Sequence, residues 1–84
     1  MEQTIEDRVI DVIKHVMRYY HDGNVVLDTN PMLDLDFDSL DLVETTMALE
    51  REFDIVIPDD EVWKEWNSVR EIVDYVKMKL ETED

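Results

Sequence analysis

Apolar residues recur at intervals of three and four along residues 4–20, which is the pattern of an amphipathic helix. The positions that form this stripe are Ile5, Val9, Val12, Ile13, Val16, Met17 and Tyr20. The sequence HDGN follows, in which Gly23, the only glycine of the chain, can adopt the left-handed conformation that closes a helix. We therefore predict a first helix over residues 4–20 that stops in this sequence.

The next segment, residues 22–37, is long for a connection in so small a chain, and connections of that length usually have a function or their own packing. It carries six apolar side chains, at Val25, Val26, Leu27, Leu33, Leu35 and Phe37. We expect the segment to wrap over the core as a lid.

A second helix is predicted from Asp38, a good N-cap residue, to about Phe53. The carboxylate of Asp41, three positions after the cap, interacts favourably with the positive end of the helix dipole. At about 100° per residue the helix has two apolar stripes, roughly 120° apart. The first, which suffices for the core, is Leu42, Thr46, Leu49 and Phe53, and the second is Leu40, Val43 and Met47.

The second stripe should lie on or near the surface beside Ser39, flanked by Asp41, Glu44 and Glu50. An apolar strip with an acidic rim is a suitable docking surface for a basic partner. The alternative is a helix that buries both stripes on one wide face.

Two further helices complete the pattern. Pro58 and the acidic residues 59–61 resemble the first turn of a short third helix, which would carry Trp63 and Trp66. Ser68 and Glu71 form a capping box for the last helix. Its buried stripe consists of Val69, Ile72, Val73, Val76 and Leu80. We predict an all-α four-helix bundle with three longer helices and one short one.

Composition narrows the class of protein. The 84 residues form one small domain, residues 1–84, and 23 acidic against 8 basic residues give a net charge of −15. This charge repels nucleic acid and anionic membranes, so partners should present basic patches.

Without cysteine there is neither a disulfide nor a thiolate metal site. No apolar run approaches the roughly 18 residues of a membrane span, and the polar start MEQTIEDR does not resemble a signal peptide. We expect a cytoplasmic protein.

Ser39 is the candidate for chemistry, and the first possibility is a catalytic nucleophile. That role needs a general base and an oxyanion-stabilising group. His15 and His21 lie on or after the first helix and are expected to be solvated surface residues, and the G-x-S-x-G elbow is absent. We predict no catalytic residue.

The second possibility is a calcium loop, because Asp34, Asp36 and Asp38 alternate as D-x-D-x-D. The sixth position of such a loop should be glycine and is Ser39, and the twelfth should be glutamate and is Thr45. We predict no metal site.

The third possibility is that Ser39 is the substrate of another enzyme, which attaches a group to its hydroxyl. A phosphodiester at the first turn of a helix is favoured by the free N–H groups and the positive helix end. The alternative is that Ser39 only helps to cap the helix.

The sequence D-S-L-D at residues 38–41, the run V-E-T-T-M-A-L-E-R-E-F-D and the later I-P-D-D resemble the acyl carrier proteins, over nearly the whole chain. The resemblance implies that a phosphopantetheinyl transferase attaches phosphopantetheine from coenzyme A to Ser39. The arm ends in a thiol that holds acyl intermediates as thioesters, for fatty acid synthesis or a related acyl-chain pathway. The protein itself would catalyse nothing.

The resemblance also implies partners. Acyltransferases and condensing enzymes with basic patches would dock on a monomeric carrier. The matching positions for docking are Asp38, Leu40, Asp41, Val43, Glu44, Met47 and Glu50.

Two residues depart from the family pattern. Asp36 stands where the family usually has glycine, and Arg51 interrupts an acidic run. The sequence W-K-E-W-N-S is similar to the D-alanine carriers of cell-wall modification. The alternatives are therefore a D-alanyl or other aminoacyl (peptidyl) carrier, or an unmodified acidic helical interaction module.

Overall fold

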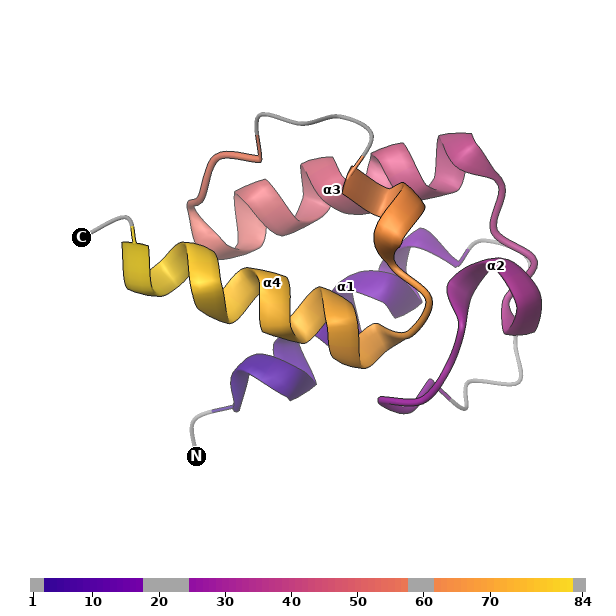
Figure 1. Ribbon diagram of the computed structural model, residues 1–84, viewed down its shortest axis with the longest axis horizontal. Helices are drawn as coiled ribbons and strands as arrows, with labels where there is room; N and C mark the ends of the chain where they lie inside the picture. Colours follow the sequence, from indigo (N-terminus) through magenta and orange to yellow (C-terminus); the bar gives the residue numbers. More distant parts are fainter. Residues whose placement is uncertain (1–2, 18–24, 58–61, 83–84) are drawn as a thin grey trace.

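The computed structural model describes residues 3–17, 25–57 and 62–82, and the regular structure of these residues is helical. The α-helices are α1 (Ile5–Val16), α2 (Pro31–Asp34), α3 (Ser39–Phe53) and α4 (Val69–Thr82), and a 3₁₀ turn, η1 (Val62–Glu65), precedes α4. The described residues contain no strand. α1 packs against both α3 and α4, and η1 contacts α3 (Figure 1). The all-α prediction is confirmed, and the short third helix is a 3₁₀ turn.

α1 begins as its sequence requires and ends earlier than predicted. The Thr4 hydroxyl accepts a hydrogen bond from the Asp7 N–H at 3.1 Å, which satisfies one free donor of the first turn. Val9 and Ile13 are fully buried on its inner face. Met17 has left the helix, with φ −70° and ψ 95°, so the predicted extension to Tyr20 is wrong. The half-buried Met17 still packs against the core from an extended backbone, and so it continues the apolar pattern without continuing the helix. Tyr20, His21 and Gly23 lie outside the described residues.

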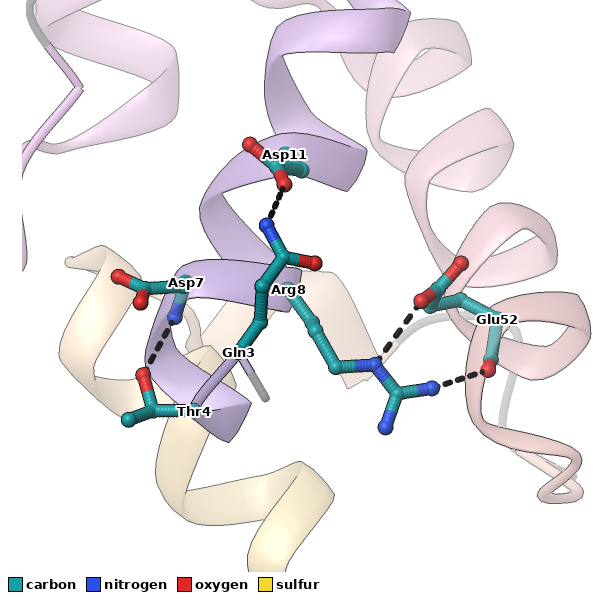
Figure 2. A network of polar contacts seen from close by, with 6 residues as sticks. All are labelled: Gln3, Thr4, Asp7, Arg8, Asp11 and Glu52. Carbon is teal, nitrogen blue, oxygen red and sulfur yellow. Dashed lines mark hydrogen bonds and ion pairs between the residues drawn. The ribbon is translucent and has the colours of Figure 1, made fainter. Parts of the chain in front are cut away.

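The end of α3 is closed by a left-handed residue and fastened to α1. Asp54 has φ 55° and its N–H donates to the Glu50 carbonyl. Arg8 of α1 donates from Nε to Glu52 Oε2 at 2.9 Å and from Nη2 to the Glu52 carbonyl at 2.8 Å (Figure 2). The guanidinium carbon also lies 4.4 Å from the ring centroid of Phe53. Arg8 therefore satisfies a free carbonyl of the last turn of α3 while it packs on an aromatic face.

The lid expectation for residues 22–37 is partly correct. Leu35 and Phe37 are buried, but Leu33 is 82% exposed and Val26 is 56% exposed. The exposure of Leu33 arises from α2, which the pattern did not predict. Asn30 caps this helix by accepting from the N–H groups of Met32 and Leu33, and its single turn buries Pro31 while Leu33 faces solvent.

The start of α4 holds this segment in place. The first two N–H groups of α4 donate to the segment's carbonyls, Val69 to Thr29 and Arg70 to Leu27, both at 2.8 Å. The buried Thr29 hydroxyl in turn accepts from the Val26 N–H at 2.9 Å. Helix-terminal donors that would otherwise need a cap thus bind the connection between α1 and α2.

The predicted capping box of α4 is present with one change. The Ser68 hydroxyl accepts from the Glu71 N–H at 3.4 Å, and the Glu71 carboxylate accepts from the N–H of Asn67 rather than Ser68. Among the predicted stripe residues Leu80 is half-buried and the others are buried. Trp66, just after η1, is buried with its ring edge-on to Tyr75 at 5.9 Å. Residues 58–61, the predicted first turn of the third helix, lie outside the described residues.

Candidate functional site

Ser39 is the first residue of α3, and its side chain is exposed. The helix is capped by its neighbours: Asp38 Oδ1 accepts from the Asp41 N–H at 2.9 Å, and Asp41 Oδ2 accepts from the Asp38 N–H at 3.1 Å. Because Asp38 and Asp41 form this reciprocal capping box, the helix does not need the Ser39 side chain as a cap. In the described part of the chain the Ser39 hydroxyl has no hydrogen bond, so the interpretation of Ser39 as a cap is wrong.

The backbone around Ser39 suits an anionic ester. The capping box uses the third N–H of α3, that of Asp41, and none of the described residues accepts a hydrogen bond from the N–H of Ser39 or Leu40. These two donors stand at the positive end of a 15-residue helix. Free N–H groups and the positive helix end would favour a phosphate attached to the Ser39 oxygen.

The approach to the site contains a sharp turn at Asp36. Its φ of 60° places it in the left-handed region, between the buried side chains of Leu35 and Phe37. The Phe37 N–H donates back to the Pro31 carbonyl at 3.0 Å. This turn places the apolar side chains on both sides of Asp36 in the core, directly before the N-cap of α3. Glycine is the residue best suited to such a φ, and aspartate is among the few others that tolerate it.

The second apolar stripe of α3 is on the surface, as predicted. Leu40 is 64% exposed and Met47 is 48% exposed, while Val43 is half-buried. The first stripe, Leu42, Thr46, Leu49 and Phe53, is buried. The alternative of a single wide buried face is therefore wrong. The pattern also missed Thr45, which is fully buried and donates its hydroxyl proton to the Asp41 carbonyl at 2.8 Å.

The acidic rim is more engaged within the fold than the sequence suggested. Asp38 and Asp41 form the capping box, and the Glu50 carboxylate accepts from the Ile57 N–H at 2.8 Å. Glu44 is half-buried. Three of the four carboxylates predicted for docking therefore also stabilise the backbone. Their role in docking remains a prediction.

A groove between α1 and α3 extends this surface. It is lined by His15, Glu44, Met47, Ala48 and Arg51, together with Val16. Arg51 is exposed, so a positive charge stands at the edge of the otherwise acidic rim. His15 is exposed, as predicted, and its Nδ1 lies 3.1 Å from the Asp11 carbonyl.

Sequence reasoning missed the exposed apolar residues of α2. Met32 is 45% exposed and Leu33 is 82% exposed, only a few residues before Ser39. The pair Asn30–Pro31 was the available signal, because an N-cap residue followed by proline at the first position is typical of a helix start.

The described residues contain no group of three histidine, cysteine or acidic side chains placed to hold a metal ion. In the same part of the chain no helix is long and apolar enough to cross a bilayer.

Comparison with known proteins agrees with this geometry. The family model described as phosphopantetheine attachment site matches residues 7–76. The chain therefore belongs to this family, that of the acyl carrier proteins, whose cofactor is covalently attached phosphopantetheine.

Two curated relatives carry the same name. The mitochondrial acyl carrier protein of Saccharomyces cerevisiae is 45% identical over 75 residues, which cover 86% of this chain and 59% of the relative. The acyl carrier protein of Clostridium acetobutylicum is 54% identical over 48 residues, 57% of this chain and 61% of the relative. The chain thus spans about three fifths of the length of the relatives it matches.

Proposed function

We propose that this protein is an acyl carrier whose phosphopantetheine is attached to Ser39. The observation that carries the proposal is an exposed hydroxyl at the first position of α3 that makes no hydrogen bond within the described residues. Beside it stand two N–H donors that have no acceptor among those residues. Membership of the phosphopantetheine attachment family supports it. On a phosphopantetheinyl transferase, the Ser39 oxygen would lose its proton and form a phosphodiester with the arm of coenzyme A. The diphosphate bond of coenzyme A would break, and adenosine 3′,5′-bisphosphate would leave.

When attached, the arm supplies the thiol that this cysteine-free chain lacks, and acyl groups are held on it as thioesters. The chain's own residues position the modified serine and present it to other enzymes. They perform no catalysis. Both relatives are named acyl carrier proteins, which favours an acyl cargo over an aminoacyl one. The pathway we propose is fatty acid synthesis or a related acyl-chain pathway.

The surface beside Ser39 supports docking of basic partners. Leu40 and Met47 expose apolar area that the core does not use, and half-buried Val43 lies between them. The carboxylates of Asp38, Asp41, Glu44 and Glu50 border it, on a chain with a net charge of −15. Transferases, acyltransferases and condensing enzymes with basic patches would complement this surface in charge. We place the monomeric carrier in the cytoplasm. Cell fractionation tests the compartment, because one relative is named mitochondrial.

The deciding experiment is the intact mass of the purified protein before and after incubation with coenzyme A, magnesium and a broad-specificity phosphopantetheinyl transferase. We expect the wild type to gain the mass of one phosphopantetheine and Ser39→Ala to gain nothing. Because Ser39 makes no side-chain hydrogen bond in the described residues, Ser39→Ala should unfold at nearly the wild-type temperature, so circular dichroism serves as the control. Folded wild type that several transferases leave unmodified would refute the proposal.

A further inference from the structure

Trp63 carries an unexplained polar atom. Among the buried side-chain nitrogen and oxygen atoms of the described residues, its Nε1 is the one without a hydrogen-bond partner. A buried indole N–H usually finds an acceptor, and an unpaired one weakens the folded state. The lack of an acceptor for the Trp63 N–H therefore requires an explanation.

The buried threonines of the described residues, Thr29, Thr45 and Thr46, are all hydrogen-bonded. The hydroxyl of Thr29 accepts from the Val26 N–H at 2.9 Å. On the inner side of α3, Thr45 donates to the Asp41 carbonyl at 2.8 Å and Thr46 to the Val43 carbonyl at 2.7 Å. These buried hydroxyl groups are thus hydrogen-bonded, whereas the buried Trp63 N–H is not.

Trp63 shares one structural neighbour, α3, with the proposed attachment site. It lies on η1, which contacts α3 and runs across it in Figure 1, and its ring packs against the main core. α3 is also the helix whose first residue is Ser39. The side chain is partly exposed, but Nε1 itself is closed to water. An acceptor can therefore reach this N–H only as part of a group that enters the apolar interior.

We infer that Trp63 Nε1–H is the hydrogen-bond donor for a carbonyl oxygen that the arm on Ser39 brings into the interior. This inference rests on the proposed function. An acyl chain alone offers the core only apolar contacts, whereas the arm and its cargo also carry carbonyl groups, from the amides, the thioester and any oxo group of the chain. A lone buried donor makes the interior prefer such an oxygen, because without it the N–H stays unpaired.

Nuclear magnetic resonance of the ¹⁵N-labelled protein tests this directly through the two indole N–H signals. Four forms are compared, each verified by intact mass: the unmodified protein, the protein with the bare arm, with a saturated acyl group and with a 3-oxoacyl group of equal length. We expect the Trp63 indole proton to move downfield in at least one loaded form, while the Trp66 signal serves as the internal control.

The form in which the shift first occurs identifies the oxygen. A shift already present with the bare arm indicates an arm amide. A shift absent with the bare arm but present with both acyl groups indicates the thioester, and a shift present only with the 3-oxoacyl group indicates the oxo group of the chain. If mass shows loading but the Trp63 signal moves in none of these forms, the inference is wrong and Trp63 only fills the core. If Ser39 is never loaded, the proposed function fails instead.

A matched pair of variants gives a second readout. Trp63→Phe removes the donor and keeps an aromatic ring, and Trp66→Phe makes the same change at a neighbouring buried tryptophan that carries no orphaned atom. Loading with the group that shifts the signal should raise the melting temperature of the wild type and of Trp66→Phe. The rise should be smaller by about 4 °C in Trp63→Phe, as expected for loss of one hydrogen bond in a domain of this size. An equal rise in Trp63→Phe would contradict the inference.

Discussion

Asp38 combines two possible roles in one carboxylate. Its Oδ1 accepts from the Asp41 N–H and so caps α3, while the exposed side chain also contributes charge beside Ser39. Asparagine caps a helix about as well as aspartate but carries no charge. The two roles can therefore be separated by substitution.

We expect Asp38→Asn to keep the free energy of unfolding within a few tenths of a kcal/mol of wild type, and Asp38→Ala to lose about 1 kcal/mol. If the charge attracts the transferase, both variants should be loaded more slowly, to a similar extent. Denaturant unfolding measures the first quantity and time-resolved intact mass the second. Slow loading of Asp38→Ala alone would show that the helix start matters and the charge does not.

Asp36 is the second residue at this scale, because its φ of 60° strains any residue with a Cβ. We expect stability to fall in the order Gly, Asp, Ala at this position, with Asp36→Gly about 1 kcal/mol more stable than Asp36→Ala. The short polar side chain of aspartate places the wild type between them. Equal stability of the two variants in thermal unfolding would mean that the backbone relaxes out of the left-handed region.

The elements of the fold differ in how well the sequence predicted them. α3 and α4 were predicted closely, because each combines a cap with several turns of apolar period. α2 was missed because one turn is too short to show a period. The end of α1 was placed too late, since Met17 packs against the core without being helical.

The residues of the site also differ in how well the sequence predicted them. Ser39 and the exposed stripe could be predicted, because both depend on a local motif and on the geometry of one helix. The hydrogen bond from the Ile57 N–H to Glu50 and the orphaned indole of Trp63 depend on how separate elements meet. Period and composition contain no information of that kind.

The docking of the 25–30 segment on α4 gives a prediction about elements. Thr29→Val keeps the buried shape but leaves the Val26 N–H without its acceptor, so we expect a loss of about 1 kcal/mol of unfolding free energy. Arg70→Ala removes only the exposed ion pair to Asp28 and keeps the backbone hydrogen bond, so it should cost roughly 0–0.5 kcal/mol. Chemical denaturation of both variants measures the difference. A larger loss for Arg70→Ala than for Thr29→Val would mean that the ion pair to Asp28 stabilises this segment more than the Thr29 hydrogen bond does.

At the scale of the whole molecule, the pairing of Glu6 with Lys77 joins α1 to α4, with Lys77 Nζ 3.1 Å from Glu6 Oε2. The pKa of Glu6 is lowered, mainly because its own backbone N–H donates to the carboxylate and next because Lys77 does. A carboxyl with a lowered pKa stabilises the folded state above its unfolded-state pKa, and this contribution disappears as the pH falls through the folded-state value.

Glu6→Gln should therefore melt at a lower temperature than wild type at neutral pH. The two melting curves should converge in acid, once Glu6 is protonated in the folded wild type as well. Thermal melts over a series of pH values provide the measurement, and Asp7→Asn in the same turn is the control. A gap between wild type and Glu6→Gln that persists unchanged into strong acid would mean that packing, rather than charge, accounts for it.

The central place of α1 has a consequence for how the protein is made. The face of α1 is covered by α3 and α4, and two of its ion pairs reach across 44 and 71 positions of the sequence. A chain emerging from the ribosome cannot complete these contacts until α4 has left the exit tunnel. α3, whose first residue is Ser39, completes its packing against α1 and α4 only then. We therefore expect Ser39 to be modified after release of the finished domain and not on the nascent chain.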